Sequence, residues 1–251
     1  MTDMNGKVAI VTGGSAGIGL ATVRRFVERG ANVVIADIDA PSGEEAVASL
    51  PEGQALFVHT DVSREEDVKE MVRKTVEQFG RLDYAVNNAG VGGAAATTAD
   101  YTLDDWRRVI DINLTGVWLC MKYELQAMLE SGGGAIVNVS SILSTVGFAT
   151  APAYVASKHG VNGLTKTAAV EYATQGIRVN TVSPGFVYTA MLEKAGMAEG
   201  TELYEQIAEL HPMHRMGTPE EAANLIVWTC SDEASFVTGA TLLVDGGYTA
   251  R

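Results

Sequence analysis

Two residues whose types could perform acid–base chemistry lie four positions apart in the segment APAYVASKHG, residues 151–160. They are Tyr154 and Lys158, and Pro152 just before them favours the start of a helix. Residues four apart share one face of a helix, so both side chains can point into the same cleft. A free tyrosine has a pKa of about 10, and a neighbouring ammonium favours its phenolate. The pair therefore suits a general acid and base that moves a proton to or from an oxygen.

A glycine-rich turn near the start of the chain indicates where a phosphate-bearing ligand would bind. The segment TGGSAGIG, residues 12–19, joins an apolar run to an amphipathic stretch, with Gly13, Gly17 and Gly19 in the spacing GxxxGxG. Glycines permit a sharp turn, and the helix that follows offers unpaired N–H groups to a pyrophosphate. The spacing is a variant of the dinucleotide fingerprint, so we expect a dinucleotide here.

The nature of that dinucleotide is indicated by Asp37, which ends the next apolar run 18 residues after Gly19. An acid at this place can accept hydrogen bonds from the adenosine ribose hydroxyls and repels a 2′-phosphate. Ala16 and Ile38 flank the same expected pocket and supply no cation. These residues favour NAD(H) over NADP(H).

Apolar runs alternate with amphipathic stretches along the whole chain, and this alternation predicts the scaffold. Near-continuously apolar strands between helices are typical of a parallel sheet covered on both faces. We predict an α/β fold with a Rossmann-type doubly wound parallel sheet of about seven strands in a three-layer sandwich, and a single domain over residues 1–251. The expected strands are 7–13, 32–38, 54–62, 82–90, 134–140, 177–185 and 241–247. A long helical stretch is expected at about 102–130.

Composition excludes several classes of function. The net charge is −13, which opposes nucleic-acid or anionic-membrane binding as a main role. No apolar run reaches the ~18 residues of a membrane span, and the first residues lack the features of a signal peptide. Two distant cysteines favour reduced core thiols, so we expect a cytoplasmic protein. His211 and His214 lie close together without a cysteine or carboxylate cluster, so we expect a loop and no metal.

Six motifs occur in a fixed order across the chain: TGGSAGIG, NNAG, the Asn113 of DINLTG, NVSS, YVASK and SPGFVYT. Together they resemble the short-chain dehydrogenase/reductase family in its compact form of about 250 residues. The resemblance implies a catalytic tetrad of Asn113, Ser141, Tyr154 and Lys158. Ser141 is preferred over Ser140 because it precedes Tyr154 by 13 residues, as in the family.

The resemblance also implies a set of contacts to the cofactor. Asp61 and Val62 would meet the adenine, Val187 and Thr189 the nicotinamide carboxamide, and Asn87 would either touch the ligand or brace the sheet. The expected cofactor-binding residues are Gly13, Ser15, Gly17, Ile18, Gly19, Asp37, Ile38, Asp61, Val62, Asn87, Ala89, Gly90, Tyr154, Lys158, Pro184, Gly185, Val187 and Thr189.

The substrate side is expected at a lid over residues 186–217. Leu143, Phe148, Phe186 and Met191 are the expected pocket residues, and they favour an apolar to moderately polar secondary alcohol or ketone. Three alternatives stay open: a 3-oxoacyl-carrier-protein reductase, a sugar dehydrogenase of the glucose type, and an NAD-binding sensor without activity. Relatives imply a homotetramer, with a dimer next.

Overall fold

The computed structural model describes residues 3–189, 192–193 and 196–250. Its centre is one seven-stranded sheet in the order β3-β2-β1-β4-β5-β6-β7, with every neighbouring pair parallel. The order reverses between β1 and β4, as the predicted doubly wound fold requires. The strands are β1 (Val8–Thr12), β2 (Asn32–Asp37), β3 (Ala55–His59), β4 (Tyr84–Asn87), β5 (Gly134–Val139), β6 (Ile177–Pro184) and β7 (Thr241–Val244).

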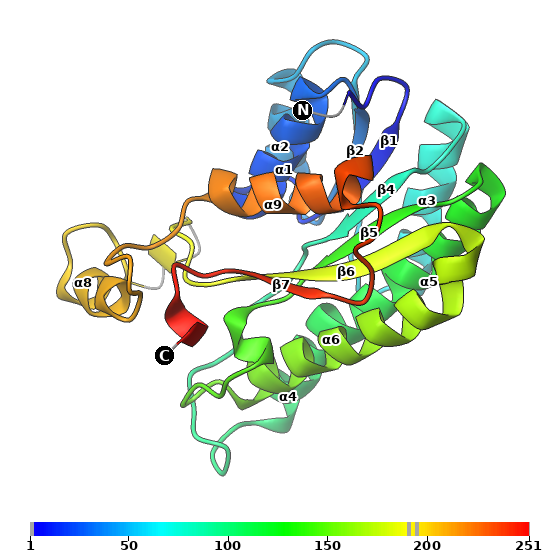
Figure 1. Ribbon diagram of the computed structural model, residues 1–251. Coiled ribbons are helices and arrows are strands. Elements are labelled where there is room, and N and C mark those ends of the chain that lie inside the picture. The colour runs from blue at the N-terminus through cyan, green and yellow to red at the C-terminus, as the bar shows by residue number, and fades with distance from the viewer. Residues whose placement is uncertain (1–2, 190–191, 194–195, 251) are drawn as a thin grey trace.

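Helices cover both faces of the sheet, and each face has its own apolar core (Figure 1). One face carries α1 (Gly17–Glu28), α2 (Ala40–Ala48) and α9 (Pro219–Cys230). The other carries α3 (Glu65–Phe79), α4 (Leu103–Ile110), α5 (Gly116–Ser131) and α6 (Pro152–Tyr172). Because the central strands are buried from both sides, their sequences read as continuous apolar runs rather than alternating ones. A shorter helix, α8 (Glu202–Glu209), stands away from the sheet.

The helix starts follow the local sequence. Pro152 opens α6 at a position where its missing N–H costs no hydrogen bond. Thr218 and Glu221 form a reciprocal capping box at the start of α9. The expected long helix is interrupted by one turn of π-helix, Asp111–Thr115, between α4 and α5. Among the described residues, no helix combines the length and apolar character needed to cross a membrane.

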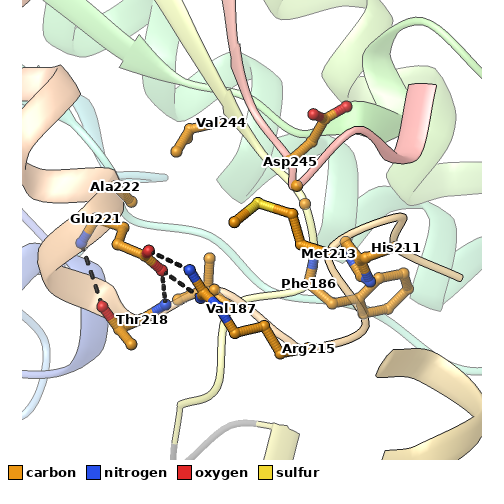
Figure 2. Close-up of a pocket in the computed structure, with 13 residues that line it drawn as sticks. Phe186, Val187, His211, Met213, Arg215, Thr218, Glu221, Ala222, Val244 and Asp245 are labelled. Carbon is orange, nitrogen blue, oxygen red and sulfur yellow. Dashed lines mark hydrogen bonds and ion pairs between the residues drawn. The ribbon is translucent and has the colours of Figure 1, made fainter. Parts of the chain in front are cut away.

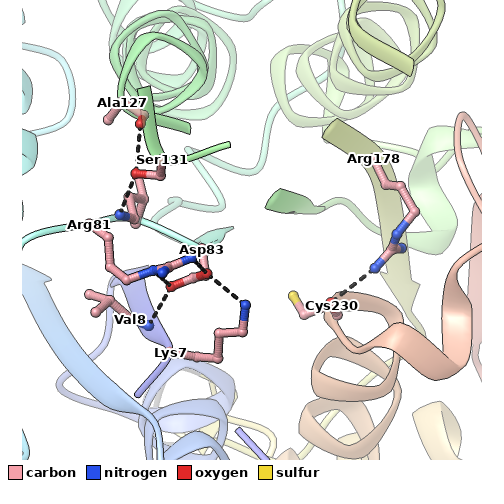
Figure 3. Close-up of polar contacts among 9 residues, drawn as sticks. Lys7, Val8, Arg81, Asp83, Ala127, Ser131, Arg178 and Cys230 are labelled. Atoms are coloured by element: carbon pink, nitrogen blue, oxygen red, sulfur yellow. Dashed lines mark hydrogen bonds and ion pairs between the residues drawn. The ribbon is translucent and has the colours of Figure 1, made fainter. Parts of the chain in front are cut away.

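Charged side chains tie together the amino-terminal edge of the sheet (Figure 3). Asp83 accepts from the Val8 N–H at 3.0 Å and pairs with Lys7 and Arg81. On the same edge, the guanidinium of Arg178 donates to the carbonyls of Thr229, Cys230, Ser231 and Val237 around the end of α9. Asp83 and Arg178 thus each have partners within the protein, whereas the residues predicted to do chemistry lie at the opposite edge.

Candidate active site

Ser141 is the second residue after the end of β5. It caps a short 3-10 helix, Ile142–Ser144, by accepting the Leu143 N–H at 3.2 Å. The same side chain hydrogen-bonds to Tyr154. The structure therefore brings together two of the predicted catalytic residues that are 13 positions apart.

Tyr154 and Lys158 project from the first two turns of α6 toward the same point. The Lys158 ammonium lies 5.6 Å from the centre of the Tyr154 ring and donates to the Val139 carbonyl at 2.9 Å. Burial lowers the pKa of Lys158 to about 8. Burial also raises the pKa of Tyr154, and the hydrogen bond from Ser141 only partly offsets this. In the protein alone, the phenol is thus the stable form.

Asn113 lies within the π-helical turn and is fully buried. Its carboxamide pairs with the backbone of Val91 in both directions, because Oδ1 accepts the N–H and Nδ2 donates to the carbonyl, each at 2.8 Å. A Cβ atom added at Gly90 would lie 3.3 Å from Asn113 Oδ1 and 3.8 Å from Lys158 Nζ. Gly90 therefore marks the point where these two groups converge, and π-turns are frequent at functional sites.

The glycine turn lies beside this group of residues and is tightly packed. A Cβ atom at Gly19 would lie 2.0 Å from the Gly13 carbonyl oxygen, so only glycine fits there. Asn88 clamps the turn, since its Nδ2 donates to the carbonyls of Thr12 and Gly13 at 3.0 Å. Gly17 has a φ of +51°, and a Cβ atom there would lie 3.3 Å from Thr189 Cγ2. Thr189, five residues after the end of β6, thus lies beside the glycine turn.

The start of α1 has the features expected of a pyrophosphate site. Its cap residue is Ala16, whose side chain cannot bond the first N–H groups of the helix, and no acid lies in the first turn. N–H groups left without a side-chain cap suit an anion. Asp37 Oδ2 accepts from both the N–H and the hydroxyl of Ser15, and Oδ1 accepts from the Asp39 N–H at 3.1 Å. The carboxylate is therefore fixed beside the turn, next to the exposed Ile38.

The remaining predicted contacts lie along the same edge, with different surroundings. Asp61 Oδ1 accepts from the Ser63 N–H and hydroxyl, which starts the turn into α3. Val62 packs against Gly116, where a Cβ atom would lie 2.9 Å from Val62 Cγ2. The Ala89 N–H bonds to the Thr12 hydroxyl at 3.1 Å. The remaining positions of this set are Ile18 at the start of α1, Pro184 and Gly185 at the end of β6, and Val187, which forms a β-bridge with Gly217.

Asn87 is buried and does not face the open edge. Its Nδ2 donates to Glu124 Oε2 at 2.9 Å and to Asn138 Oδ1 at 3.0 Å. Two roles were considered for Asn87, contact with the ligand and bracing of the sheet. Its hydrogen bonds to α5 and β5 are those of a residue that braces the sheet. Glu124 belongs to this group, but sequence reasoning assigned it no part, because a lone glutamate on an amphipathic helix normally faces solvent.

The substrate side of the site is aromatic. Phe148, which is 39% exposed, lies with its ring centre 6.0 Å from that of Phe186, and Leu143 is buried nearby on the 3-10 helix. Tyr248 from the C-terminal segment joins them, 6.1 Å from Phe186. Met191 lies outside the described residues.

His211 lies in the irregular segment just after α8, in agreement with the expected loop, but it has a structural role that the sequence did not indicate. Its side chain is buried, with Nδ1 3.0 Å from the Ile207 carbonyl and Nε2 3.3 Å from the Phe186 nitrogen. An acceptor role for Nε2 toward that N–H leaves the proton on Nδ1. His211 thus joins the lid to the end of β6. Only its place between apolar Leu210 and Pro212 distinguishes it in the sequence from exposed His214.

A small pocket opens behind His211, between the lid and the start of α9 (Figure 2). Its volume is about 100 Å³, and it is lined by Phe186, Met213, Asp245 and the paired side chains Arg215 and Glu221. None of the predicted catalytic residues lines this pocket. It is lined instead by Gly185 and Val187, two predicted cofactor-binding residues, and by Phe186, a predicted pocket residue.

Comparisons with known proteins agree with this arrangement. Residues 13–249 match a family model described as enoyl-(acyl carrier protein) reductase. The chain is 47% identical to a 2,5-dichloro-2,5-cyclohexadiene-1,4-diol dehydrogenase of Sphingobium indicum, over 100% of both chains. It is 42% identical to a cyclohexanol dehydrogenase of an Acinetobacter species, over 98% of this chain and 96% of that one.

Solved structures give the same result. A crystal structure of levodione reductase superposes with a TM-score of 0.94 at 34% sequence identity, covering 98% of this chain and 99% of that chain. The sheet order, the arrangement of polar residues at one edge and the full-length similarity to alcohol dehydrogenases agree with one another. The chain belongs to the short-chain dehydrogenase/reductase family and is a secondary alcohol dehydrogenase of that family.

Proposed function

We propose that this protein is an NAD(H)-dependent oxidoreductase that interconverts a cyclic secondary alcohol and its ketone, with Tyr154 as the general acid and base. The observation that carries the proposal is the convergence of Tyr154, Ser141 and Lys158 beside the glycine turn. A nicotinamide cofactor supplies or accepts the hydride, and the protein must supply the proton transfer and the binding.

In this proposal, each member of the tetrad has a separate task. Ser141 holds the substrate oxygen, and Tyr154 removes its proton during oxidation or returns it during reduction. Lys158 supplies the positive charge that lowers the pKa of Tyr154 against the effect of burial, and its ammonium is near enough to do so. Asn113 orders the turn of chain around Gly90, beside the Lys158 ammonium.

The preference for NAD(H) is supported by the fixed carboxylate of Asp37. Ser15 and the Asp39 N–H hold this group beside the glycine turn, where it can accept from ribose hydroxyls. A 2′-phosphate would meet this negative charge, with no cation at Ala16 or Ile38 to offset it.

The substrate class is supported by the aromatic surroundings and by the relatives. Phe148 and Phe186 offer ring faces that suit a flat or puckered carbocycle. The relatives named for a cyclohexadienediol, for cyclohexanol and for cis-4-hydroxycyclohexanecarboxylate share 42–47% of their residues with this chain. We propose that residues 186–217 act as a lid over this substrate, within a single domain of 251 residues.

We further propose that the protein assembles as a homotetramer in the cytoplasm. Large apolar side chains are exposed on the helices of one face, at Trp106, Trp118 and Val170 on α4, α5 and α6, and on the edge strand β7 at Leu243. Exposed apolar side chains on a helical face and on a sheet edge suit contacts with further copies of the chain. Buried free thiols at Cys120 and Cys230 suit a reducing compartment. A mass close to one chain by light scattering would contradict the tetramer.

A substrate panel tests the proposed activity. The purified protein is given NAD⁺ or NADP⁺ with cyclohexanol, substituted cyclohexanols, linear secondary alcohols and glucose, and reduced cofactor is followed by absorbance. We expect the highest kcat/KM with NAD⁺ and a cyclic alcohol. Turnover of glucose alone would favour the sugar dehydrogenase alternative. Binding of NAD⁺ without turnover of any alcohol or ketone would contradict the activity.

A further inference from the structure

Two buried oxygen atoms at the centre of the molecule lack hydrogen-bond partners, and they belong to neighbouring side chains. They are Asn87 Oδ1 and Glu124 Oε1. Both residues are at most 1% exposed, and their other polar atoms are bonded to each other, with Asn87 Nδ2 2.9 Å from Glu124 Oε2. A buried polar atom without a partner is costly, so the paired occurrence of two such atoms needs an explanation.

The orientation of the Asn87 amide is fixed by its second neighbour. Asn138 Nδ2 lies 3.2 Å from Met121 Sδ, which can only accept, and 2.8 Å from the Thr165 hydroxyl, so Asn138 Oδ1 is the acceptor that faces Asn87. Asn87 must therefore present Nδ2 to both Asn138 and Glu124, and its oxygen remains. An ionised Glu124 has only acceptors and could offer nothing to that oxygen. A neutral carboxylic acid has one O–H donor, which is the missing partner.

We propose that Glu124 is held as the neutral carboxylic acid and forms a two-pronged pair with the Asn87 amide, acting as a positioning residue for the active site. In this pair the Glu124 O–H donates to Asn87 Oδ1 while Glu124 Oε2 accepts from Asn87 Nδ2. Every polar atom of the two side chains then has a partner.

The charges around the pair favour the neutral acid. Burial raises the pKa of Glu124 to about 8, and the hydrogen bond from Asn87 opposes this only in part. Cys120, one turn earlier on α5, is a titratable neighbour, and burial raises the pKa of its thiol as well. From α6 the pair meets the neutral Thr165 through Asn138, whereas the Lys158 ammonium is engaged with Val139. The helix α3 packs against α5 and contributes apolar side chains to the core on this face of the sheet.

The position of the pair explains why it can act on the site. Asn87 ends β4, and the next residue, Asn88, clamps the glycine turn. Asn138 is one residue before Val139, whose carbonyl holds Lys158, and its side chain reaches α6 at Thr165. The pair therefore connects the strand end that supports the cofactor turn with the strand end and helix that carry the acid–base group. Ionisation of Glu124 would remove the hydrogen bond to Asn87 Oδ1, and so weaken the support of both strand ends.

Infrared spectroscopy of the protein with isotope-labelled glutamate tests the protonation state without any substrate. Glu124 is the only glutamate among the described residues that is almost fully buried. We expect a carbonyl band of a protonated carboxylic acid at neutral pH, absent in Glu124→Gln and retained in Glu130→Gln, an exposed position on the same helix. A spectrum with carboxylate bands alone at neutral pH would overturn the proposal, whether or not the variants fold.

The pH dependence of stability gives a second readout. The pKa of Glu124 is raised from 4.5 to about 8 in the folded protein. The folded state then holds a proton that the unfolded chain has released, so stability from this group falls as the pH rises through that range. The amide of the E124Q variant keeps both prongs and does not titrate. We expect the urea midpoint of the wild type to fall relative to E124Q between about pH 5 and about pH 8.5. A constant difference would overturn the proposal.

Activity tests the positioning role and rests on the proposed function. The ratio of kcat for E124Q over wild type should rise several-fold above about pH 8, because the ionisation of Tyr154 is common to both proteins and cancels in the ratio. A flat ratio, with the acid band present, would leave Glu124 neutral but would overturn its role in positioning. If no substrate is turned over, the proposed function fails, but the infrared and urea results still show whether Glu124 is neutral and paired with Asn87.

Discussion

The catalytic floor and the lid are built in different ways. The catalytic floor comprises the ends of β4 and β5, the π-turn and the first two turns of α6. Its polar side chains bond to the backbone at short distances, such as Lys158 to Val139 at 2.9 Å and Asn113 to Val91 at 2.8 Å. The lid, residues 186–217, carries apolar side chains that remain 40% exposed at Leu203 and 59% exposed at Met213. Its buried polar anchor is His211.

This difference separates two parts of the function. A floor in which each group is oriented by the backbone suits a proton transfer whose geometry must not vary. A lid with exposed apolar side chains can vary its contacts with a substrate without disturbing that geometry. The proposed chemistry therefore depends on the floor and the choice of alcohol on the lid. Substitutions in the floor should change kcat, and substitutions in the lid should change KM.

The largest effect is expected from Lys158→Met. Loss of the ammonium leaves Tyr154 with a pKa raised by burial, so kcat for alcohol oxidation at neutral pH should fall about 10²–10⁴-fold. Lys166→Met, at an exposed position on the same helix, is the matched control and should retain activity. Activity of K158M close to wild type would contradict the division between floor and lid.

The same variant carries a pH signature in stability. The folded-state pKa of Lys158 is about 8, below its ordinary value of 10.5. Between these values the unfolded chain binds the extra proton, so the free energy of unfolding attributable to this group rises as the pH rises from about 8 to about 10.5. Urea titrations of wild type and K158M across this range measure the difference, which should grow in favour of the wild type. A difference that shrinks or stays flat would count against a desolvated lysine.

Cofactor choice should respond next most strongly. Asp37→Ala together with Ala16→Arg removes a fixed carboxylate and adds a cation beside the glycine turn. Charged hydrogen bonds contribute about 1.5–3 kcal/mol each, so the ratio of kcat/KM for NADP⁺ over NAD⁺ should rise about 10²-fold. An unchanged ratio would remove Asp37 from its assigned role. The floor should be unaffected, so kcat with saturating cofactor should stay within a few-fold of wild type.

In the lid, His211→Ala should have an intermediate effect. It leaves the Phe186 N–H and the Ile207 carbonyl without their side-chain partner, at a cost of about 1–3 kcal/mol. We expect KM for the alcohol to rise about tenfold with a smaller change in kcat. His214→Ala, an exposed position three residues later, is the control. A loss confined to kcat would show that the lid is part of the acid–base geometry.

The smallest effect is expected at the exposed base of the lid. Arg215 pairs with Glu221 through two hydrogen bonds of 2.8 and 2.6 Å, but both side chains are more than 40% exposed. Exposed pairs contribute about 0.2–1 kcal/mol, so Arg215→Ala should lower the urea midpoint only slightly and leave kcat unchanged. If R215A lowered the urea midpoint more than H211A does, Arg215 rather than His211 would be the more important contact of the lid.

Much of the fold follows from the sequence because its signals are local. Apolar runs and turn residues predict each strand, and the order of the runs predicts parallel pairing with helices on both faces. The convergence of Ser141, Tyr154 and Lys158 was also predictable, through helical spacing and the resemblance of the motifs. The π-turn at Asn113 was not, because one inserted residue per turn leaves no local signature.

The parts that sequence reasoning missed depend on tertiary contacts. Glu124 resembles any acid on a helix surface until β4 and β5 bring Asn87 and Asn138 beneath it. His211 lies in an irregular segment, and its burial depends on Phe186, 25 residues earlier, and on Tyr248 near the C-terminus. Both are polar groups whose partners are distant in sequence, and no periodicity reports such partners.

The most direct test of the central claim is the formation of NADH and ketone from NAD⁺ and a cyclic secondary alcohol by wild type and by Tyr154→Phe. The phenylalanine ring keeps the packing of α6 and removes only the hydroxyl. Tyr204→Phe in the lid removes a hydroxyl elsewhere and serves as the control. Wild type and Y204F should form both products in equal amounts, and Y154F should be slower by about 10²–10⁴-fold. Equal rates in Y154F and wild type would contradict the assignment of Tyr154 as the acid–base residue.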